Sequence, residues 1–423
     1  MDKRWKCCLL IFLFTCFFSP FLKGEEESVE DLKGDKELQS LLKEAEEESQ
    51  KGSSSSTGKE SSSESTASPG VIQKISQKLN EFNPRITIFG DISYHWSHKP
   101  VYNEEGEQIS RRFSLREAEG DFRADVDPYA KGVLIVSLGE ETPNQYTVDI
   151  EEGYITFESL PWNFRAKIGK FRPDIGILNK LHLHDVPQFN YPLPIQRFLG
   201  EEGLSTAGAA LMWLFPYAPW DFSLQVLNVD QESAFPYPQR KNGKLSASSY
   251  PSIFFRNKLQ ESFLENYELQ MGMTYGFGYG DKKNRLKNQI FGMDFFFRWR
   301  PLKRGTYRSF VIQTEFFYVE RERFQQDGGN IYSIGLYSFI QYQINRNIYL
   351  GGRYDFSHDL EDSKNREYKL SGYVSYYTTE FLRLRLGYEY HHLNRQRPDI
   401  HSIFFQITFV FGSHPAEPYW VNR

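Results

Sequence analysis

The chain has 423 residues, a formal net charge of −5 and a mean hydropathy of −0.56. After residue 22, no stretch approaches the roughly 18 consecutive apolar residues that a membrane-spanning helix requires, so a helical membrane bundle is excluded. The negative net charge also argues against a nucleic-acid partner. Aromatic residues make up 16% of the chain, which is high for a water-soluble domain.

The first 24 residues are typical of a secretory signal peptide. Lys3, Arg4 and Lys6 form a basic start, and residues 7–18 (CCLLIFLFTCFF) form a short apolar core. All three cysteines of the chain lie in this segment, 1–24. The mature chain is therefore expected to have no disulfide, no thiol chemistry and no cysteine-ligated metal.

A polar region separates the signal segment from the folded body. Residues 25–50 are acidic and place leucines at helical spacing, so they form either a solvated charged arm or a short amphipathic helix. Residues 51–83 contain a Ser-rich linker, which cannot bury enough apolar surface to fold, and a short amphipathic segment. A disordered or short-helical N-terminal arm is therefore expected.

From residue 85 onward, apolar and polar side chains alternate along almost every segment. Within 382–390, Leu and Tyr occupy the even positions, while Arg383, Arg385 and Glu389 occupy odd ones. A period of two predicts strands, because successive side chains of a strand point to opposite faces. These strands run about 9–13 residues, the length of a tilted transmembrane strand and longer than most globular strands.

The strand pattern predicts an all-β fold, a transmembrane antiparallel β-barrel over residues 84–411 followed by a tail, 412–423. The polar set of alternating side chains contains both charge signs. The apolar set ends in aromatic residues, as in barrels with aromatic girdles around a polar lumen. Alternating short turns and long loops predict about 16 strands, with 14–18 allowed and both termini in the periplasm. Long loops are expected at 139–146 and, after the fifth strand, at 171–203. A barrel of this size has room for an aqueous channel.

The polar parity of the strands supplies charges that would line the pore. The basic candidates are Arg165, Lys167, Arg298, Arg353, Lys369, Arg383 and Arg385; the acidic candidates are Glu119, Asp121, Asp125, Glu268, Asp294, Glu315, Asp355 and Glu389. Three interpretations remain open. The mixture gives weak ion selectivity, or a basic wall faces an acidic wall across the lumen, or the charges pair with one another and only solvate the interior.

The long loop 171–203 contains the candidate metal ligands. By analogy with porins of this general size, we expect the loop to fold into the lumen and set its narrowest point. His182 and His184, at i and i+2, would hold Zn²⁺ together with Asp185. The alternative is that both histidines are ordinary hydrogen-bonding loop residues. Apart from this zinc hypothesis, no cofactor is expected.

An enzymatic role is not expected. His95 and Ser97 have the spacing of the Ser–His pair of an outer-membrane phospholipase, but they lie on the lumen-facing parity, which a lipid substrate does not reach. The sequence also lacks a G-x-S-x-G nucleophile elbow.

Several segments resemble a family of bacterial outer-membrane barrels. They are FSLREAEGDFRADVDPYAKG (113–132), VDIEEGYITFESLPWNFRAKIGKFR (148–172), LNKLHLHDVPQFNYPL (178–193) and FLGEEGL (198–204). This family is related in style to the phosphate-selective porins and is often labelled as TonB-dependent or zinc-regulated outer-membrane receptors. The resemblance covers about residues 84–419, and it implies a barrel in the outer membrane of a Gram-negative bacterium.

These observations lead us to expect an outer-membrane porin for passive diffusion of small hydrophilic solutes or ions. A TonB-linked receptor for a metal or small ligand is an alternative, although such transporters have about 22 strands and a plug. An envelope-structural or adhesive barrel is a third. The expected partners are outer-membrane lipid, small solutes or ions, a homotrimer and a periplasmic partner of the arm, and no nucleic acid.

Overall fold

The computed structural model describes most of the chain from residue 84 to residue 422. Gaps in the description fall at 104–105, 229–233, 242–243, 247–249, 264, 282, 304, 325–328, 394–397 and 414–417. The predicted signal segment (1–24), the acidic arm (25–50) and the linker with its amphipathic segment (51–83) lie outside the described residues. No helix in the described part of the chain is long and apolar enough to cross a membrane.

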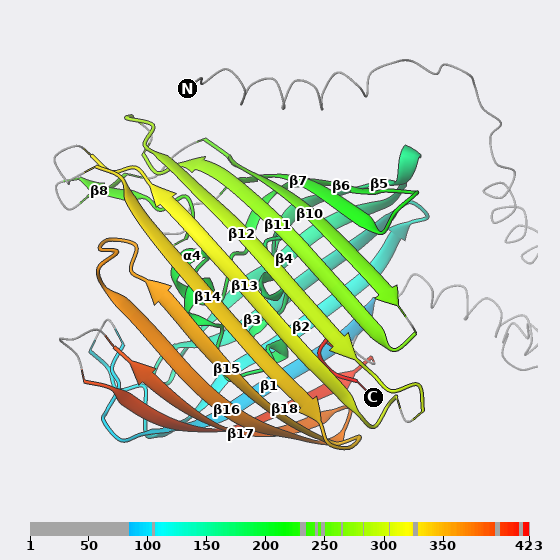
Figure 1. Cartoon of the computed structure of the whole chain (residues 1–423), viewed down its shortest axis with the longest axis vertical. Coiled ribbons are helices and arrows are strands. Elements are labelled where there is room, and N and C mark those ends of the chain that lie inside the picture. The colour runs from blue at the N-terminus through cyan, green and yellow to red at the C-terminus, as the bar shows by residue number, and fades with distance from the viewer. Residues whose placement is uncertain are drawn as a thin grey trace, which may run out of the picture. The chain divides into compact units, whose positions relative to one another are not determined.

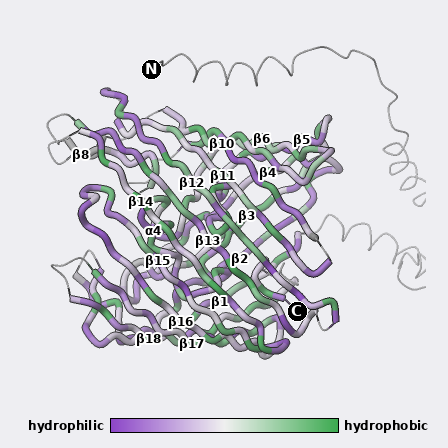
Figure 2. Tube along the Cα trace, in the orientation of Figure 1, coloured by the Kyte–Doolittle hydropathy of each residue, from purple (hydrophilic) through white to green (hydrophobic). Residues whose placement is uncertain are grey.

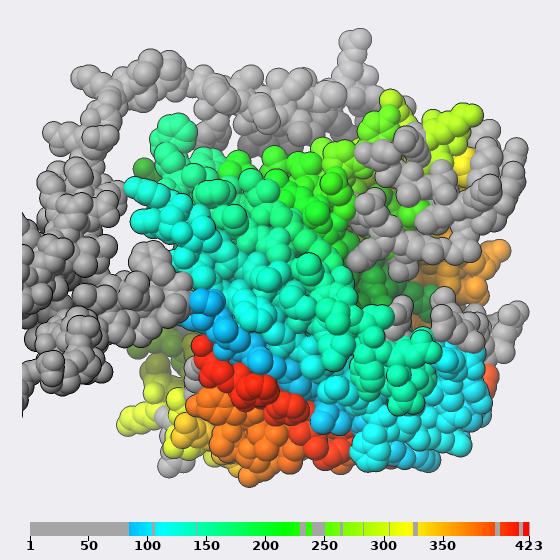
Figure 3. All heavy atoms as spheres, turned by 180° about the vertical axis from the view of Figure 1, so that it is seen from behind, coloured from blue at the N-terminus to red at the C-terminus, as the bar shows by residue number. Residues whose placement is uncertain are grey.

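Sixteen antiparallel strands close into one barrel, which confirms the predicted fold class and strand number (Figure 1). The barrel closes where β1 pairs with β18, so the blue and red ends of the described chain lie side by side in Figure 3. The barrel strands are β1 (Arg85–Ser97), β2 (Arg112–Asp127), β3 (Ala130–Thr142), β4 (Gln145–Leu160), β5 (Phe164–Phe171), β6 (Thr206–Leu214), β7 (Trp220–Asn228), β10 (Ser252–Phe263), β11 (Tyr267–Tyr279), β12 (Lys287–Trp299), β13 (Ser309–Arg321), β14 (Ile331–Gln343), β15 (Ile348–His358), β16 (Arg366–Thr379), β17 (Leu382–His392) and β18 (Ile400–Gly412).

The loops contain a few short elements. A two-stranded hairpin, β8 (Gln239–Lys241) and β9 (Lys244–Ser246), lies in the connection between β7 and β10. The turn after β4 is the 3-10 helix η1 (Pro161–Asn163). The loop between β5 and β6 contains η2 (Leu178–Lys180), η3 (Leu183–Asp185) and one α-helical turn and a half, α4 (Leu193–Phe198).

The alternating sequence produces a barrel with an apolar outside and a polar inside. On β17, the outward Leu386 and Tyr388 are 55% and 47% exposed, whereas the inward Arg385 is 2% exposed. The hydropathy colours alternate along the strands in the same way (Figure 2). Exposed aromatic side chains such as Trp162 and Tyr217 lie at the short turns, and Phe113 and Tyr332 lie near the opposite ends of their strands. This distribution is typical of a lipid-facing band with two girdles.

One predicted loop is wrong. Residues 139–146 are not a long loop, because β3 and β4 remain paired up to Thr142 and Gln145 and leave only a two-residue turn. The Glu140 carboxylate accepts a hydrogen bond from the backbone N–H of Asn144 (2.8 Å) and pairs with Arg112. These contacts make a tight turn from a polar segment that resembles a loop in sequence.

The connection between β5 and β6, residues 172–205, folds into the barrel and is called the inner loop here. Its apolar side chains, including Leu178, Ile195 and Phe198, are fully buried and form one cluster with inward residues of the wall such as Phe317 and Tyr337. Helix α4 packs against β14 and β15. The lumen is therefore filled in part by a hydrophobic core, which the alternation of a single strand does not predict.

The end of the tail also lies inside the barrel. The Trp420 side chain is fully buried, and its indole N–H donates to the backbone oxygen of Asp185 in the inner loop (2.8 Å). The Asn422 side-chain amide donates to Gly305 O (2.6 Å), which lies in the short turn between β12 and β13, and also donates to the side-chain oxygen of Gln343. The tail and the inner loop therefore support one another within the lumen.

Candidate functional site

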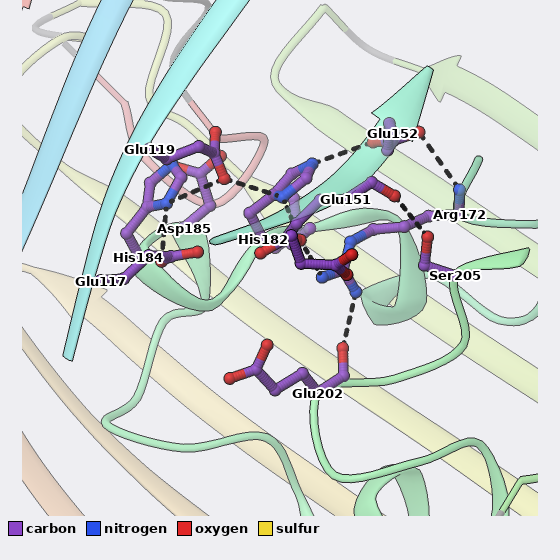
Figure 4. A network of polar contacts seen from close by, with 12 residues as sticks. Glu117, Glu119, Glu151, Glu152, Arg172, His182, His184, Asp185, Glu202 and Ser205 are labelled. Atoms are coloured by element: carbon purple, nitrogen blue, oxygen red, sulfur yellow. Dashed lines mark hydrogen bonds and ion pairs between the residues drawn. The ribbon is translucent and has the colours of Figure 1, made fainter. Parts of the chain in front are cut away.

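Four glutamates and two histidines meet where the inner loop contacts β2 and β4 (Figure 4). This group is called the glutamate–histidine cluster and consists of Glu117 and Glu119 from β2, Glu151 and Glu152 from β4, and His182 and His184 from the inner loop. Each of the six residues is only 2–7% exposed. The cluster is therefore a buried polar site on one side of the lumen.

A β-bulge in β4 brings two consecutive glutamates into the lumen. Glu152 pairs with Ile135 of β3 while Ile150 pairs with Val136, which leaves Glu151 as the extra residue. In a regular strand, one of two adjacent side chains would face lipid. The bulge instead buries both carboxylates on the inner face.

His182 is surrounded by three of these carboxylates. Its Nδ1 lies 3.0 Å from Glu151 Oε2 and 3.0 Å from Glu119 Oε2, and its Nε2 lies 2.9 Å from Glu152 Oε1. Both ring nitrogens therefore contact glutamate oxygens.

His184 approaches the same central carboxylate from the other side. Its Nδ1 lies 3.2 Å from Glu117 Oε2 and 3.8 Å from Glu119 Oε2. Its ring stacks on Phe89 at a centroid distance of 4.1 Å and lies nearly parallel to the ring of His182, 6.0 Å away. The Nδ1 atoms of both histidines thus converge on Glu119.

The surrounding carboxylates favour protonated imidazoles. Burial alone would lower the pKa of His182, but contacts with the glutamates outweigh burial and raise that pKa well above its ordinary value. Burial also opposes protonation of His184, yet the charges of Glu119 and Asp185 and the contact with Glu117 raise its pKa to about 9.

Arg172, at the end of β5, orients the β4 side of the cluster. Its Nη2 donates to Glu151 Oε2 (2.7 Å), its Nη1 donates to Glu202 O (2.6 Å), and its backbone N–H donates to Glu152 (3.1 Å). The Ser205 hydroxyl donates to the backbone oxygen of Glu151 (2.5 Å). Both ends of the inner loop therefore help to hold these carboxylates.

The predicted ligands are brought together only in part. His182 and His184 do lie side by side, but Asp185 lies 3.7 Å from Nε2 of His184, away from the Nδ1 atoms. Two sets of three side chains instead place one potential ligand atom each within 4.8 Å of one another: Glu117, Glu119 and His184, and Glu119, Glu151 and His182.

Glu117, Glu151 and Glu152 are not among the site residues predicted from the sequence. The sequence contains a signal for the bulge. The outward apolar residues Val148 and Ile150 lie at even positions before the two glutamates, whereas the outward Ile155 lies at an odd position after them. A change of parity within one strand indicates an extra residue.

Many of the predicted pore-lining charges form ion pairs, either with one another or with another arginine of the wall. Among the described residues, these ion pairs are Arg353 with Asp355 (2.7 Å), Lys369 with Glu389 (3.2 Å), Asp294 with Arg256 (2.6 Å), Asp121 with Arg123 (2.8 Å), and Arg298 with Glu268. At these residues, the structure therefore matches the third interpretation, in which the inward charges pair with one another.

The inner loop covers three of the predicted pore-lining arginines. Arg383 donates to His184 O (2.5 Å), Arg385 donates to Gln188 O (2.7 Å) and Val186 O (3.1 Å), and Arg353 donates to Asn190 O (2.7 Å). The arginines face inward as the alternation predicts, but they are only 2–6% exposed. Their role as pore-lining residues stays a prediction; in this structure the loop backbone lies against their guanidinium groups.

The remaining predicted charges lie in different surroundings. Arg165 is exposed, as is Asp125. The Lys167 ammonium lies over the rings of Tyr154 (4.2 Å) and Phe171 (5.3 Å). Glu315 accepts hydrogen bonds from the backbone N–H groups of the inner loop at 177 and 178.

A polar cavity of about 240 Å³ adjoins the cluster. Its charged lining residues are Arg116, Glu140, Asp149, Glu151, Lys170, Arg172 and Glu202. The cavity lies between the inner loop and the β2–β5 side of the wall.

His95 and Ser97 have separate partners. His95 Nε2 contacts Ser402 Oγ (3.1 Å), and the Ser97 hydroxyl donates to Lys99 O (2.5 Å). The absence of an enzymatic role stays an expectation.

No family model matches this chain. A protein of Aquifex aeolicus (strain VF5), described as uncharacterized, is 27% identical over 351 residues, which cover 75% of this chain and 72% of the relative. Among solved structures, the high-pH structure of Pseudomonas putida OprB has a TM-score of 0.53 at 10% identity and covers 83% of this chain and 99% of that chain. The outer membrane channel DcaP of Acinetobacter baumannii has a TM-score of 0.49 at 9% identity and covers 78% of this chain and 96% of that chain.

The structure and these similarities define the class of protein. The chain is a sixteen-stranded antiparallel β-barrel with the fold of outer-membrane barrels. The finer resemblance to phosphate-selective porins or to zinc-regulated, TonB-dependent receptors stays a prediction.

Proposed function

We propose that this protein is an outer-membrane channel through which small hydrophilic solutes or ions diffuse. One observation supports this above all: the sixteen-stranded barrel is apolar outside and charged inside. An apolar outer face suits a bilayer, and a charged inner face suits a hydrated path. The proposal places the protein in the outer membrane, with the short turns and both termini in the periplasm.

The inner loop and the tail form the constriction of this channel. The loop packs against β14 and β15 through α4, and the tail occupies the end near the turn at Gly305. The polar cavity beside β2–β5 contains both charge signs. We therefore infer a narrow path with mixed-charge lining, which favours small polar solutes over large ones and gives modest ion selectivity.

Single-channel recording in planar bilayers tests this proposal. The refolded barrel is expected to give discrete conductance steps that scale with salt concentration. A variant in which residues 174–203 of the inner loop are replaced by a short Gly-Ser linker should give larger steps. If neither protein conducts while both show the heat-dependent electrophoretic mobility of folded barrels, the channel function is wrong. A sealed structural barrel or an energy-coupled receptor would then account for the fold.

A further inference from the structure

We propose that the glutamate–histidine cluster binds divalent transition-metal ions, with Glu119 shared between two adjacent sites. The first site consists of Glu119, Glu151 and His182, and the second of Glu117, Glu119 and His184. This inference concerns the buried cluster itself and does not depend on the channel function.

The donor atoms have the chemistry and spacing of a metal site. Imidazole nitrogens with carboxylate oxygens are ligands of Zn²⁺ and of other first-row divalent ions. Bonds of roughly 2.0–2.2 Å place two ligands of a tetrahedral ion roughly 3.3–3.6 Å apart. The separations from Glu119 Oε2 to the two Nδ1 atoms are 3.0 and 3.8 Å, and Glu117 lies 3.2 Å from His184 Nδ1. The two shorter separations must lengthen slightly and the longer one must shorten slightly to reach this range.

The central oxygen atom has an unused lone pair. Glu119 is 2% exposed, and its Oε2 forms ion-pair contacts with the two histidine Nδ1 atoms but no hydrogen bond of good geometry with any residue that the structure describes. The nearby Nδ1 of His182 is hydrogen-bonded to Glu151 Oε2 instead. A buried carboxylate oxygen without a donor is costly. Because this atom points between the two histidines, a bound cation would satisfy it (Figure 4).

Outer contacts already orient the ligands. With Nδ1 of His182 on the metal, its Nε2–H would donate to Glu152 (2.9 Å), the arrangement by which a carboxylate fixes the tautomer and the plane of a metal-binding histidine. Arg172 holds the Glu151 carboxylate at 2.7 Å. His184 is fixed by its stack on Phe89.

The charge of the cluster also favours a cation. Four carboxylates meet there, and Arg172 offsets one of the negative charges. With neutral histidines, three negative charges would remain in a buried space, which is unfavourable unless they are paired or bind a metal. A single divalent ion removes most of this excess.

Zinc titration of the full mature barrel tests the site. The protein is refolded, stripped with EDTA and titrated with Zn²⁺ by calorimetry, and with Co²⁺ while its visible absorption is recorded. We expect one or two ions per chain at micromolar or tighter dissociation constants. Glu119→Gln, which removes the shared ligand, should weaken binding by more than the roughly 10–100-fold that loss of an outer contact costs. Glu152→Gln should weaken it by about 10-fold.

Two matched variants serve as controls. Glu367→Gln changes another largely buried glutamate that contacts a histidine, His391 (3.1 Å), outside the cluster. Glu268→Gln changes a glutamate on β11 that pairs with Arg298, outside the cluster. Both should leave zinc affinity within about twofold of the original, since neither belongs to the two ligand sets.

The possible outcomes distinguish loss of the metal site from failure to refold and from failure of the channel proposal. If E119Q does not refold, His184→Gln replaces it; this variant removes a ligand of the second site and should weaken zinc binding there by a similar factor. Zinc binding no tighter in the original protein than in the refolded E119Q or H184Q protein would overturn the site, as would an equal loss in E268Q. In that case the histidines hold only protons between the carboxylates. A barrel that binds Zn²⁺ but does not conduct would refute only the channel.

Discussion

The inner loop contacts two sides of the lumen wall, and the two sides hold it in different ways. On strands β13–β17, the anchoring wall, Glu315, Arg353, Arg383 and Arg385 bond to backbone groups of the loop. On strands β2–β4, the glutamate wall, the contacts run between carboxylates and loop histidines. Backbone groups do not titrate in the physiological range, whereas histidine and carboxylate side chains change charge or bind cations.

The two walls are therefore expected to have different roles, one in stabilising the fold and the other in binding and permeation. The anchoring wall combines ion pairs between neighbouring wall residues with a hydrophobic core under the loop. The glutamate wall adjoins the polar cavity and contains a buried oxygen, Glu119 Oε2, that contacts the histidines but forms no hydrogen bond of good geometry with a described residue. We therefore expect damage to the anchoring side to change folding energy, and damage near the glutamate wall to change binding and permeation.

Removal of Trp420 should have the largest effect. Trp420→Ala deletes a fully buried side chain that lies near the Arg383 and Arg385 guanidinium groups (5.8 and 6.0 Å). We expect a loss of about 4 kcal/mol in the free energy of unfolding, since a large buried aromatic leaves a cavity. Denaturant titration of the refolded barrel measures it. Leu302→Ala, in an exposed turn (69%), should change the free energy by at most about 0.5 kcal/mol. Equal losses for the two variants would show that the tail does not brace the lumen.

Removal of one anchoring guanidinium should cause the second-largest loss in the free energy of unfolding. Arg385→Ala removes the donor to Gln188 O and Val186 O and leaves these loop carbonyls buried. We expect a destabilisation of about 3 kcal/mol by the same titration, because unsatisfied buried acceptors are costly. Arg165→Ala, an exposed arginine of the same inward parity, is the control and should cost at most about 0.5 kcal/mol. A neutral R385A variant would refute the anchoring role.

Thiol labelling should distinguish the two walls by accessibility. The mature chain is expected to contain no cysteine, so single cysteines are informative. Ser375→Cys lies under Arg385 at zero exposure, whereas Thr147→Cys lines the polar cavity. A small water-soluble reagent should modify the Thr147 variant at least about ten times faster, since the buried thiol must wait for local opening. Equal rates would mean that water reaches both walls.

A charge change at the cavity should give the smallest effect. Lys170 pairs with Asp149 (3.1 Å) at a partly exposed position in the cavity lining. Lys170→Glu should raise the cation-to-anion permeability ratio by about twofold, measured as a shift of the reversal potential under a salt gradient. Lys303→Glu, in a short turn between β12 and β13, changes the net charge equally and should leave the ratio unchanged. A shift of the same size in both variants would place the selectivity elsewhere.

The sequence allowed prediction of inward and outward faces, but not of what covers the inward face. The parity of Arg383 and Arg385 correctly predicts that both point into the barrel. Their contacts are with residues 184–188, nearly 200 positions away, and no local pattern reports such a contact. The same limit applies to Asp185, which the spacing within one loop predicts as a metal ligand, because such spacing does not show which strands the loop meets.

What the sequence by itself determined is the barrel: a period of two, strand lengths suited to a bilayer and turns that alternate with loops all follow from local chemistry. The pairing around the lumen, including the bulge at Glu151 and the entry of Trp420, was decided only by the tertiary structure. The physical reason is that closure of the barrel brings distant segments into one enclosed space. Only there do four glutamates and two histidines become neighbours.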